Sequence, residues 1–241
     1  MSTTEELFRD DANLLVCNAV ITAIGADGIE LDRTVFYPQG GGQAGDAGVL
    51  RRTDGAELAI ADARKGAEAG QIMHVPVSAA DSAGWVVGQA VTAQIDANRR
   101  QAHRRFHTAT HLLCALVPHP VDGCSITAGY ARLDFHMTEP LDKDALSAGI
   151  ARLVAEAHPV RQRWITEDEL DANPGLVRSM SVQPPRGQGR VRLVEVDGVD
   201  LQPCGGTHVD NTADIGAVVV TKVEKKSAKT RRVVIGFAQD R

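Results

Sequence analysis

Short apolar runs separated by turn residues dominate the first part of the chain. Between residues 13 and 95 they include LLVCNAVITAIGADGIELD and VVGQAVTAQID, with Asp-Gly and Gly-Asp pairs among them. Short runs punctuated in this way are typical of β-hairpins in a small barrel or sandwich. We therefore predict a small N-terminal β-barrel domain over residues 1–95, and its glycine-rich segment FYPQGGGQAGDAG must contain a tight loop.

The pattern changes at Asp96, where a helical stretch begins. The segment NRRQAHRRFHTATHLLCALV has neither Gly nor Pro before Pro118, and the Asp96 carboxylate can cap the first turn. A second helix is predicted at residues 143–157, where apolar side chains recur at helical spacing.

Extended segments return towards the C-terminus. GRVRLVEVDGVDLQPCGGTH predicts two strands joined at Asp197-Gly198, and GAVVVTKVEKK followed by TRRVVIGF predicts another hairpin. The second domain, residues 96–241, is therefore expected to be α+β with an antiparallel sheet. The fold class of the whole chain is α+β.

Composition excludes several classes of protein. Hydrophobic residues at 43% and charged residues at 24% are close to the average for globular domains, which excludes a disordered or fibrous chain. The sequence has no apolar run approaching the roughly 18 residues of a membrane span, and its N-terminus lacks the order of a signal peptide. We expect a cytoplasmic protein with no membrane partner. The oligomeric state is open, with a monomer as the working expectation.

The net charge of −5 argues against a protein that coats nucleic acid by bulk attraction. Basic residues are nevertheless clustered: Arg99, Arg100, Arg104 and Arg105; Arg186, Arg190 and Arg192; Lys222, Lys225, Lys226, Lys229, Arg231 and Arg232. Any one cluster is typical of a solvated face. Their gathering around the candidate metal ligands described next favours contact with phosphates.

His107 and His111 are the first pair of candidate metal ligands. On a helix this spacing turns the second side chain by only about 40° and raises it by roughly 6 Å, so both imidazoles project from one face. Thr108 stands where a zinc peptidase of the H-E-x-x-H type has its glutamate, which disfavours that class. Taken alone, the pair is equally typical of ordinary surface or core histidines.

Cys204 and His208 are the second pair, in the segment CGGTH that follows a predicted strand. Two glycines permit a tight turn that aims a thiolate and an imidazole at one point. One cysteine and three histidines form a typical zinc set. Four firm protein ligands would close the site, so either one is loose or the ion accepts a fifth ligand; the sequence leaves both open.

Four motifs together resemble a known family. HTATHLL at 107–113, RVRLVEV at 190–196, PCGGTH at 203–208 and the T-x-F-Y-P-x-G-G-G-Q pattern from Thr34 to Gln43 are similar to the editing domain of alanyl-tRNA synthetase and its free-standing AlaX-type relatives, in the larger form with an N-terminal barrel. The resemblance covers nearly the whole chain. It departs at the first position of the Met-Arg-x-His pattern that ends at the first ligand, His107: Arg104 replaces the Met, whereas Arg105 matches.

The resemblance implies a set of site residues. His107, His111, Cys204 and His208 would bind Zn²⁺, Thr34 and Gln43 would serve serine recognition and hydrolysis, and Gly40, Gly41 and Gly42 would shape their loop. The implied activity is hydrolysis of the ester in tRNA(Ala) misacylated with serine, which supports translation fidelity; whether glycine is also removed stays open. The candidate tRNA contacts are Arg104, Arg105, Lys225, Lys226, Arg231 and Arg232.

Physical chemistry supports this activity independently of the resemblance. Zinc can activate water for ester hydrolysis, so no nucleophilic side chain is needed. An apolar alanine pocket rejects serine poorly, which makes a second, hydrolytic site useful. Conversely, a site whose polar groups must be satisfied by the serine hydroxyl binds alanine poorly.

Two alternatives stay open. Gly-Gly-Gln also occurs in translation release factors, which would make the chain another aminoacyl- or peptidyl-tRNA hydrolase without a task for zinc. Alternatively, the chain is an RNA-binding module without catalytic activity, in which a closed zinc site only stabilises the fold.

Overall fold

The computed structural model describes residues 3–180 and 189–238, and the chain divides into two compact units. The first, here the barrel unit, comprises Met1–Gly40 and Ala44–Gln101; the second, the C-terminal unit, comprises Gly41–Gln43 and Ala102–Arg241. The division lies near the predicted change at Asp96. It differs from the predicted ranges in assigning residues 41–43 of the glycine-rich loop to the C-terminal unit, for a reason given below.

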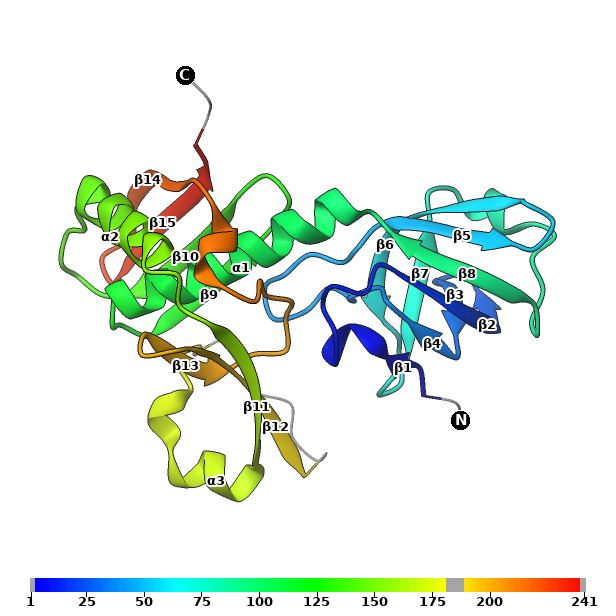
Figure 1. Cartoon of the computed structure of the whole chain (residues 1–241), viewed down its shortest axis with the longest axis horizontal. Coiled ribbons are helices and arrows are strands. Elements are labelled where there is room, and N and C mark those ends of the chain that lie inside the picture. Colours follow the sequence, from blue (N-terminus) through cyan, green and yellow to red (C-terminus); the bar gives the residue numbers. More distant parts are fainter. Residues whose placement is uncertain (1–2, 181–188, 239–241) are drawn as a thin grey trace. The chain divides into compact units, whose positions relative to one another are not determined.

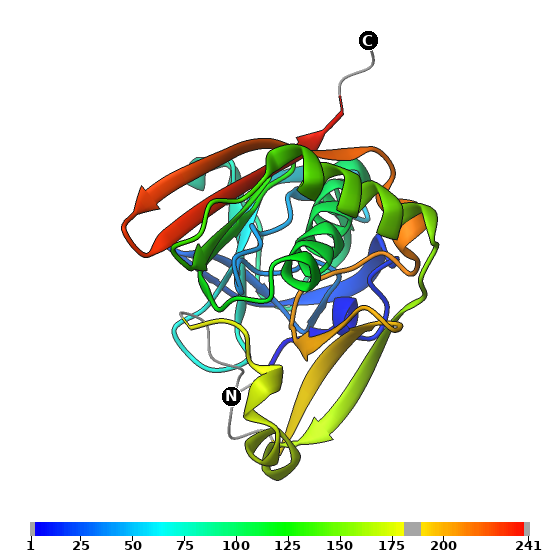
Figure 2. The ribbon, with the colours of Figure 1, turned by 90° about the vertical axis from the view of Figure 1, so that its left-hand side faces the viewer.

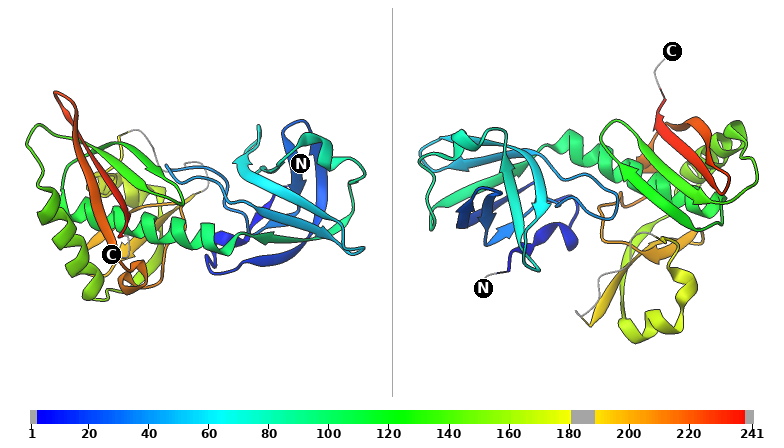
Figure 3. Two further views of the ribbon diagram at one scale, coloured as in Figure 1. Left: turned by 90° about the horizontal axis from the view of Figure 1, so that it is seen from above. Right: turned by 180° about the vertical axis from the view of Figure 1, so that it is seen from behind.

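Six antiparallel strands close the barrel unit (Figures 1 and 3). In spatial order they are β2 (Val16–Gly25), β3 (Gly28–Leu31), β7 (Ile72–Pro76), β6 (Glu57–Lys65), β5 (Gly48–Arg52) and β8 (Ala90–Ile95). The short strands β1 (Glu5–Glu6) and β4 (Arg33–Thr34) pair in parallel, and 3₁₀ turns occupy η1 (Leu7–Arg9) and η2 (Ala79–Ser82). The predicted barrel is confirmed.

Alternation of apolar and polar side chains explains why these segments form a barrel. Along β6 and β8, buried residues alternate with exposed ones, as a strand with one face in a core requires. The inward residues form one apolar cluster that includes Ile21, Leu31, Leu50, Leu58 and Ile72.

Helix α1 (Ala97–Leu116) leads from the barrel unit into the C-terminal unit. The Asp96 carboxylate accepts hydrogen bonds from the backbone N–H groups of Asn98 and Arg99 at 2.9 and 3.0 Å, which confirms the predicted N-cap. Its apolar face enters the core of the C-terminal unit through Phe106, Leu112 and Leu113.

A four-stranded antiparallel sheet in the order β14-β15-β10-β9 forms the main layer of the C-terminal unit. Its strands are β14 (Val218–Ser227), β15 (Thr230–Phe237), β10 (Ala131–His136) and β9 (Val121–Ile126). Figure 2 shows α1 and α2 (Lys143–Ala155) beside this sheet. Both helices share one apolar cluster with the sheet, including Ile150, Leu133 and Val233.

A second, smaller antiparallel sheet in the C-terminal unit carries part of the candidate site. It consists of β11 (Val160–Thr166), β12 (Arg190–Val196) and β13 (Asp200–Pro203) (Figure 1). In the sequence, α3 (Glu167–Ala172) and the 3₁₀ turn η3 (Pro174–Leu176) follow β11, and the 3₁₀ turn η4 (Thr212–Ile215) follows β13. The α+β class with antiparallel sheets is thereby confirmed. Among the described residues, no helix has the length and apolar character needed to cross a membrane.

Candidate metal centre

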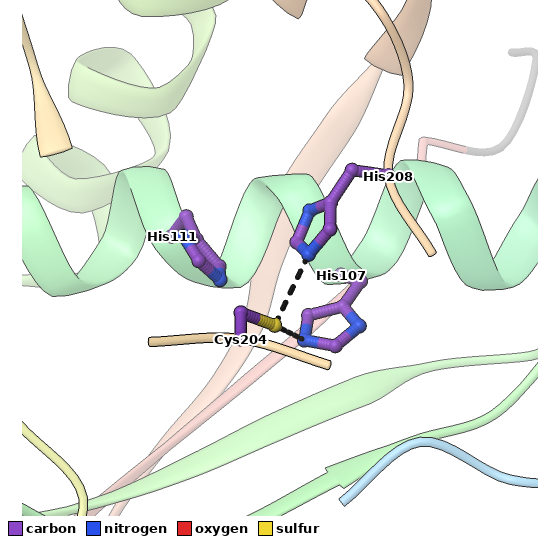
Figure 4. A group of neighbouring side chains, drawn as sticks. All are labelled: His107, His111, Cys204 and His208. Carbon is purple, nitrogen blue, oxygen red and sulfur yellow. Dashed lines mark hydrogen bonds between the residues drawn. The ribbon is translucent and has the colours of Figure 1, made fainter. Parts of the chain in front are cut away.

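His107, His111, Cys204 and His208 converge in the C-terminal unit (Figure 4). One ligand atom from each side chain lies within 4.8 Å of all the others. The Cys204 Sγ is 3.3 Å from His107 Nε2 and 3.2 Å from His208 Nε2. Two ligands come from successive turns of α1 and two from the loop after β13, as the sequence predicts.

Hydrogen bonds at the far side of each ring decide which imidazole nitrogen faces the ligand cluster. His111 Nδ1 donates to Asp200 Oδ2 at 2.9 Å, because an ionised carboxylate can only accept. His107 Nδ1 donates to the Gln43 amide oxygen at 2.8 Å. Both rings therefore direct Nε2 towards the cluster, which is the arrangement found for histidine ligands of zinc.

Thr108 holds the third ring in the same way. Its hydroxyl donates to the Arg104 carbonyl at 3.0 Å, which leaves the oxygen to accept from His208 Nδ1 at 3.1 Å and from the Val209 N–H at 3.2 Å. His208 thus also presents Nε2. All three histidines have a hydrogen-bond partner behind the ring, and such partners are typical of metal sites.

The electrostatics of the cluster favour a cation. Although burial would raise the pKa of the Cys204 thiol, the neighbouring His107 and His208 hold that pKa well below its ordinary value. Burial lowers the pKa of His208 well below its ordinary value, which keeps the ring neutral. For His111, burial is opposed by hydrogen bonds to Asp200 and Cys204, which raise the pKa to about 9. Metal binding therefore requires loss of a proton from His111.

Close backbone approach explains one of the two glycines in CGGTH. A Cβ on Gly206 would lie 2.1 Å from His107 Cε1 and 2.9 Å from the Gln43 amide oxygen. Only glycine lets the loop pass over the imidazole. The loop is also held by Arg192, whose Nη1 donates to the carbonyls of Cys204 at 2.9 Å and Gly206 at 3.0 Å.

Gln43 belongs to the C-terminal unit because its backbone and side chain are bound there. It forms an isolated parallel bridge with Ile126 on β9, and the Ile126 N–H donates to the Gly42 carbonyl at 2.8 Å. Gly42 has φ +87°, and a Cβ there would lie 2.8 Å from Cys124 Sγ. The Gln43 amide exchanges hydrogen bonds with Thr207: its Nε2 donates to the hydroxyl at 3.0 Å, and its oxygen accepts from the backbone N–H at 3.1 Å.

The donor set fits a divalent ion that takes sulfur and imidazole ligands. One thiolate and three imidazole nitrogens are a ligand set that zinc accepts, typically at a Zn–S distance of about 2.3 Å and Zn–N distances of about 2.0–2.1 Å. The four side chains are therefore a group that could hold a metal ion.

Comparison with known proteins places the chain in a family. Residues 191–234 match the profile of the threonyl and alanyl tRNA synthetase second additional domain, and residues 8–99 match that of class II (A) tRNA synthetases. Alanyl-tRNA editing protein AlaX-M of Methanosarcina acetivorans is 33% identical over 95% of this chain and 97% of that protein. The chain belongs to the AlaX family of alanyl-tRNA editing proteins. The resemblance stated from the motifs is confirmed.

Other relatives agree with this placement. AlaX-M of Saccharolobus solfataricus is 32% identical over 95% of this chain and 97% of that protein. An alanine–tRNA ligase of Methanothermobacter thermautotrophicus is 32% identical over 95% of this chain, but only 26% of the ligase is covered. The match therefore covers nearly all of the AlaX-M relatives and about a quarter of the ligase.

Thr34, the other predicted AlaX site residue, lies in the barrel unit. It is fully buried, and its hydroxyl is 2.7 Å from His74 Nε2 and accepts from the Phe36 N–H at 3.0 Å. His74 Nδ1 donates to the Ile29 carbonyl at 2.9 Å, so the Thr34 hydroxyl must donate its proton to His74. One acceptor position on the Thr34 oxygen is then left for a further donor. The serine-recognition role of Thr34 stays a prediction.

The six basic residues predicted to contact tRNA have different surroundings in this AlaX chain. Arg104 donates to the His208 carbonyl at 2.6 Å and Arg231 to the Glu139 carbonyl at 3.1 Å, and both side chains are buried. Arg105 donates to the Ile215 carbonyl at 2.7 Å. Arg232 and Lys226 both bind Asp134 at 2.7 Å, and Lys225 is exposed. Their role towards tRNA stays a prediction, and Arg186 of the predicted clusters lies outside the described residues.

Sequence reasoning missed the partners behind the ligands. Asp200 binds the ring of His111, and Thr108 binds the ring of His208. Neither residue belongs to a motif with a recognisable spacing to the histidine that it binds, so the sequence does not distinguish it from the other Asp and Thr residues. Gln43 was singled out by the family motif, yet its contact with His107 needed the structure.

Proposed function

We propose that this chain is a trans-editing hydrolase that deacylates mischarged tRNA(Ala), chiefly seryl-tRNA(Ala), with glycyl-tRNA(Ala) as a further substrate to be tested. The observation that carries the proposal is the convergence of His107, His111, Cys204 and His208 with a hydrogen-bond partner behind each ring. Support also comes from relatives that are named alanyl-tRNA editing proteins and that match this chain over 97% of their own length.

The proposal assigns Zn²⁺ to the four ligands. When bound there, zinc supplies Lewis-acid chemistry, which activates water or polarises the ester carbonyl. The three histidines are almost completely buried, at 4% to 5% exposure, whereas Cys204 is partly exposed. The ester therefore approaches on the Cys204 side, and editing requires a fifth position at the ion or release of one ligand.

The remaining residues position the site in this proposal. Gln43 acts through His107, since its amide holds that ring and the Thr207 backbone rather than projecting into solvent. This contact also weighs against the release-factor alternative, in which a glutamine on a Gly-Gly-Gln loop must reach the ester itself. The family motif supports a role for Thr34 in serine recognition, and within the barrel unit its hydroxyl donates to His74.

The test is a deacylation assay. Seryl-, glycyl- and alanyl-tRNA(Ala) are incubated with the zinc-loaded protein, and release of each amino acid is followed. Serine is expected to be released quickly and alanine to be retained, because alanine leaves the buried polar groups unpaired. Thr34→Val is expected to reduce the ratio of serine to alanine release. Undiminished serine ester after prolonged incubation refutes the proposal.

Metal removal separates the alternatives. With a chelator or with Cys204→Ala, seryl-tRNA deacylation is expected to be lost while the barrel unit stays folded. Activity that survives would favour the release-factor alternative. If zinc has only a structural role, the wild-type protein releases no serine even with zinc bound, and metal removal unfolds the C-terminal unit.

A further inference from the structure

An exposed tryptophan lies on the small sheet that supports the candidate metal centre. The chain has two tryptophans: Trp85 is 8% exposed in the barrel unit, whereas Trp164 on the edge strand β11 is 41% exposed. A large aromatic ring on an edge strand contributes little to a core, and aromatic residues are enriched at interaction surfaces.

The register of the sheet relates Trp164 to a metal ligand. Trp164 is directly opposite Arg192 on β12, and the Cys204 N–H donates to the Arg192 carbonyl at 3.1 Å. The three residues therefore form one row across the sheet, and directly opposite side chains share a face. With neighbouring strands about 4.8 Å apart, the Trp164 backbone lies roughly 10 Å from that of Cys204.

The same face meets the metal centre. Asp200 alternates with Leu201 along β13 in the register that places it on the Arg192 and Trp164 face, and Asp200 holds the ligand His111. Arg192 binds the carbonyls of Cys204 and Gly206. The face therefore runs without interruption from the ligands to the exposed ring.

The charge around the ring suits a polyanion. The Arg190 guanidinium lies over the Trp164 ring, 4.5 Å from its centroid. Arg190 and Arg192 lie on the same face of the sheet as Trp164, and no acidic side chain of β11 or β12 lies on that face. Arg161 and Arg163 lie on the opposite face, where they pair with Asp197 and Glu195. Aromatic rings beside arginines form the usual platform for unpaired nucleotides, because every base can stack on them.

We infer that Trp164 and Arg190 bind the single-stranded nucleotides next to the 3′ end of the substrate tRNA by stacking. The inference rests on the proposed function: if the 3′-terminal ester lies at the metal ligands, the preceding nucleotides must leave the site across a neighbouring surface. The row from Cys204 to Trp164 provides one at a distance of about one to two nucleotides, and it binds bases irrespective of sequence.

Fluorescence tests this binding directly. In the Trp85→Phe protein, Trp164 is the sole tryptophan. An uncharged RNA hairpin with a single-stranded 3′ tail is expected to quench its fluorescence, and the same hairpin with a blunt end is not. Equal quenching by both hairpins, or none by either, overturns the inference.

Substitution measures the contribution of the ring. Trp164→Ala is expected to weaken binding of the tailed hairpin by roughly 5- to 150-fold, the range for one stacked base, and Trp164→Phe to restore part of it. Tyr130→Ala is the matched control, since Tyr130 is 43% exposed in the same unit and is expected to leave binding unchanged. Unchanged binding by Trp164→Ala, or an equal loss in Tyr130→Ala, contradicts the inference.

Kinetics separate this inference from the proposed function. Trp164→Ala is expected to raise KM for seryl-tRNA(Ala) while kcat and zinc content stay close to wild type, because the ring lies away from the ester. If the wild-type protein releases no serine, the proposed function fails, whereas tail-dependent quenching still reports on Trp164. The inference is overturned if Trp164→Ala has the KM of the wild type. It is also overturned if Trp164 fluorescence is quenched without RNA when the protein concentration is raised, because a second copy of the chain would then cover the ring.

Discussion

The imidazole of His107 has a defined role for each ring nitrogen, which makes Gln43 testable. Nδ1 donates to the Gln43 amide oxygen at 2.8 Å, and Nε2 faces Cys204. Gln43→Ala removes the acceptor that fixes the ring. We expect zinc affinity to fall about 10- to 100-fold, as for other partners behind a metal ligand. Competition for zinc with a chromogenic chelator measures this.

A second glutamine in the same segment provides the control. Gln39 is exposed and its backbone N–H, not its side chain, binds the Ala63 carbonyl, so Gln39→Ala is expected to keep wild-type zinc affinity. The ligand-to-metal absorption of the cobalt-substituted protein reports the ring orientation without any turnover. Equal affinity and equal spectra in Gln43→Ala and wild type would show that Gln43 does not position His107.

Single residues also show where sequence reasoning ends. His107 and His111 could be paired from helical spacing, and Cys204 and His208 from a tight glycine turn. Asp200 could not be connected with His111, 89 residues earlier, because no local period links a strand residue to a helix that distant. Likewise, a sequence cannot show that the Arg104 and Arg231 guanidinium groups are buried on carbonyl oxygens rather than exposed to RNA.

At the scale of elements, His74 links three strands of the barrel and makes their stability depend on pH. From β7 it donates to Ile29 on β3 and accepts from Thr34 on β4. Burial lowers the pKa of His74 from 6.5 to about 4, with a smaller opposing effect from the Ile29 carbonyl. Between pH 6.5 and about 4, His74 is therefore protonated in the unfolded chain but neutral in the folded barrel.

The expected result is a loss of barrel stability as the pH falls from about 6.5 to 4, and no further loss from this group below that range. The full effect is about 3 kcal/mol, at 1.36 kcal/mol for each pKa unit. Urea unfolding of the Trp164→Phe protein, followed through Trp85, measures it, and His74→Gln should flatten the pH dependence. An NMR titration that gives His74 an ordinary pKa near 6.5 would contradict this account.

Elements differ in how far local pattern determines them. The barrel strands and α1 follow from alternation and from the Asp96 cap, both of which act over a few residues. The assignment of Gly41–Gln43 to the C-terminal unit does not follow from local pattern, because it depends on the pairing of Gln43 with Ile126 on β9. A glycine-rich loop has no hydrophobic period of its own, so its partner strand decides where it belongs.

At the scale of the whole molecule, each unit has its own apolar core, but only the C-terminal unit contains the four metal ligands. The barrel cluster includes Phe36 and Leu50, and the C-terminal cluster includes Phe106 and Phe135. A ligand that binds only the folded state stabilises the part that holds it. Zinc should therefore act on one of the two units.

Two single-tryptophan proteins make this difference measurable. Trp85→Phe reports the C-terminal unit through Trp164, and Trp164→Phe reports the barrel through Trp85. Zinc at about 1,000 times its Kd adds roughly 4 kcal/mol to the unit that binds it. A chelator is thus expected to lower the urea midpoint seen by Trp164 and to leave that seen by Trp85 unchanged. Two midpoints that fall together would mean that α1 couples the units into one cooperative transition, and unchanged midpoints would mean that the four side chains hold no zinc.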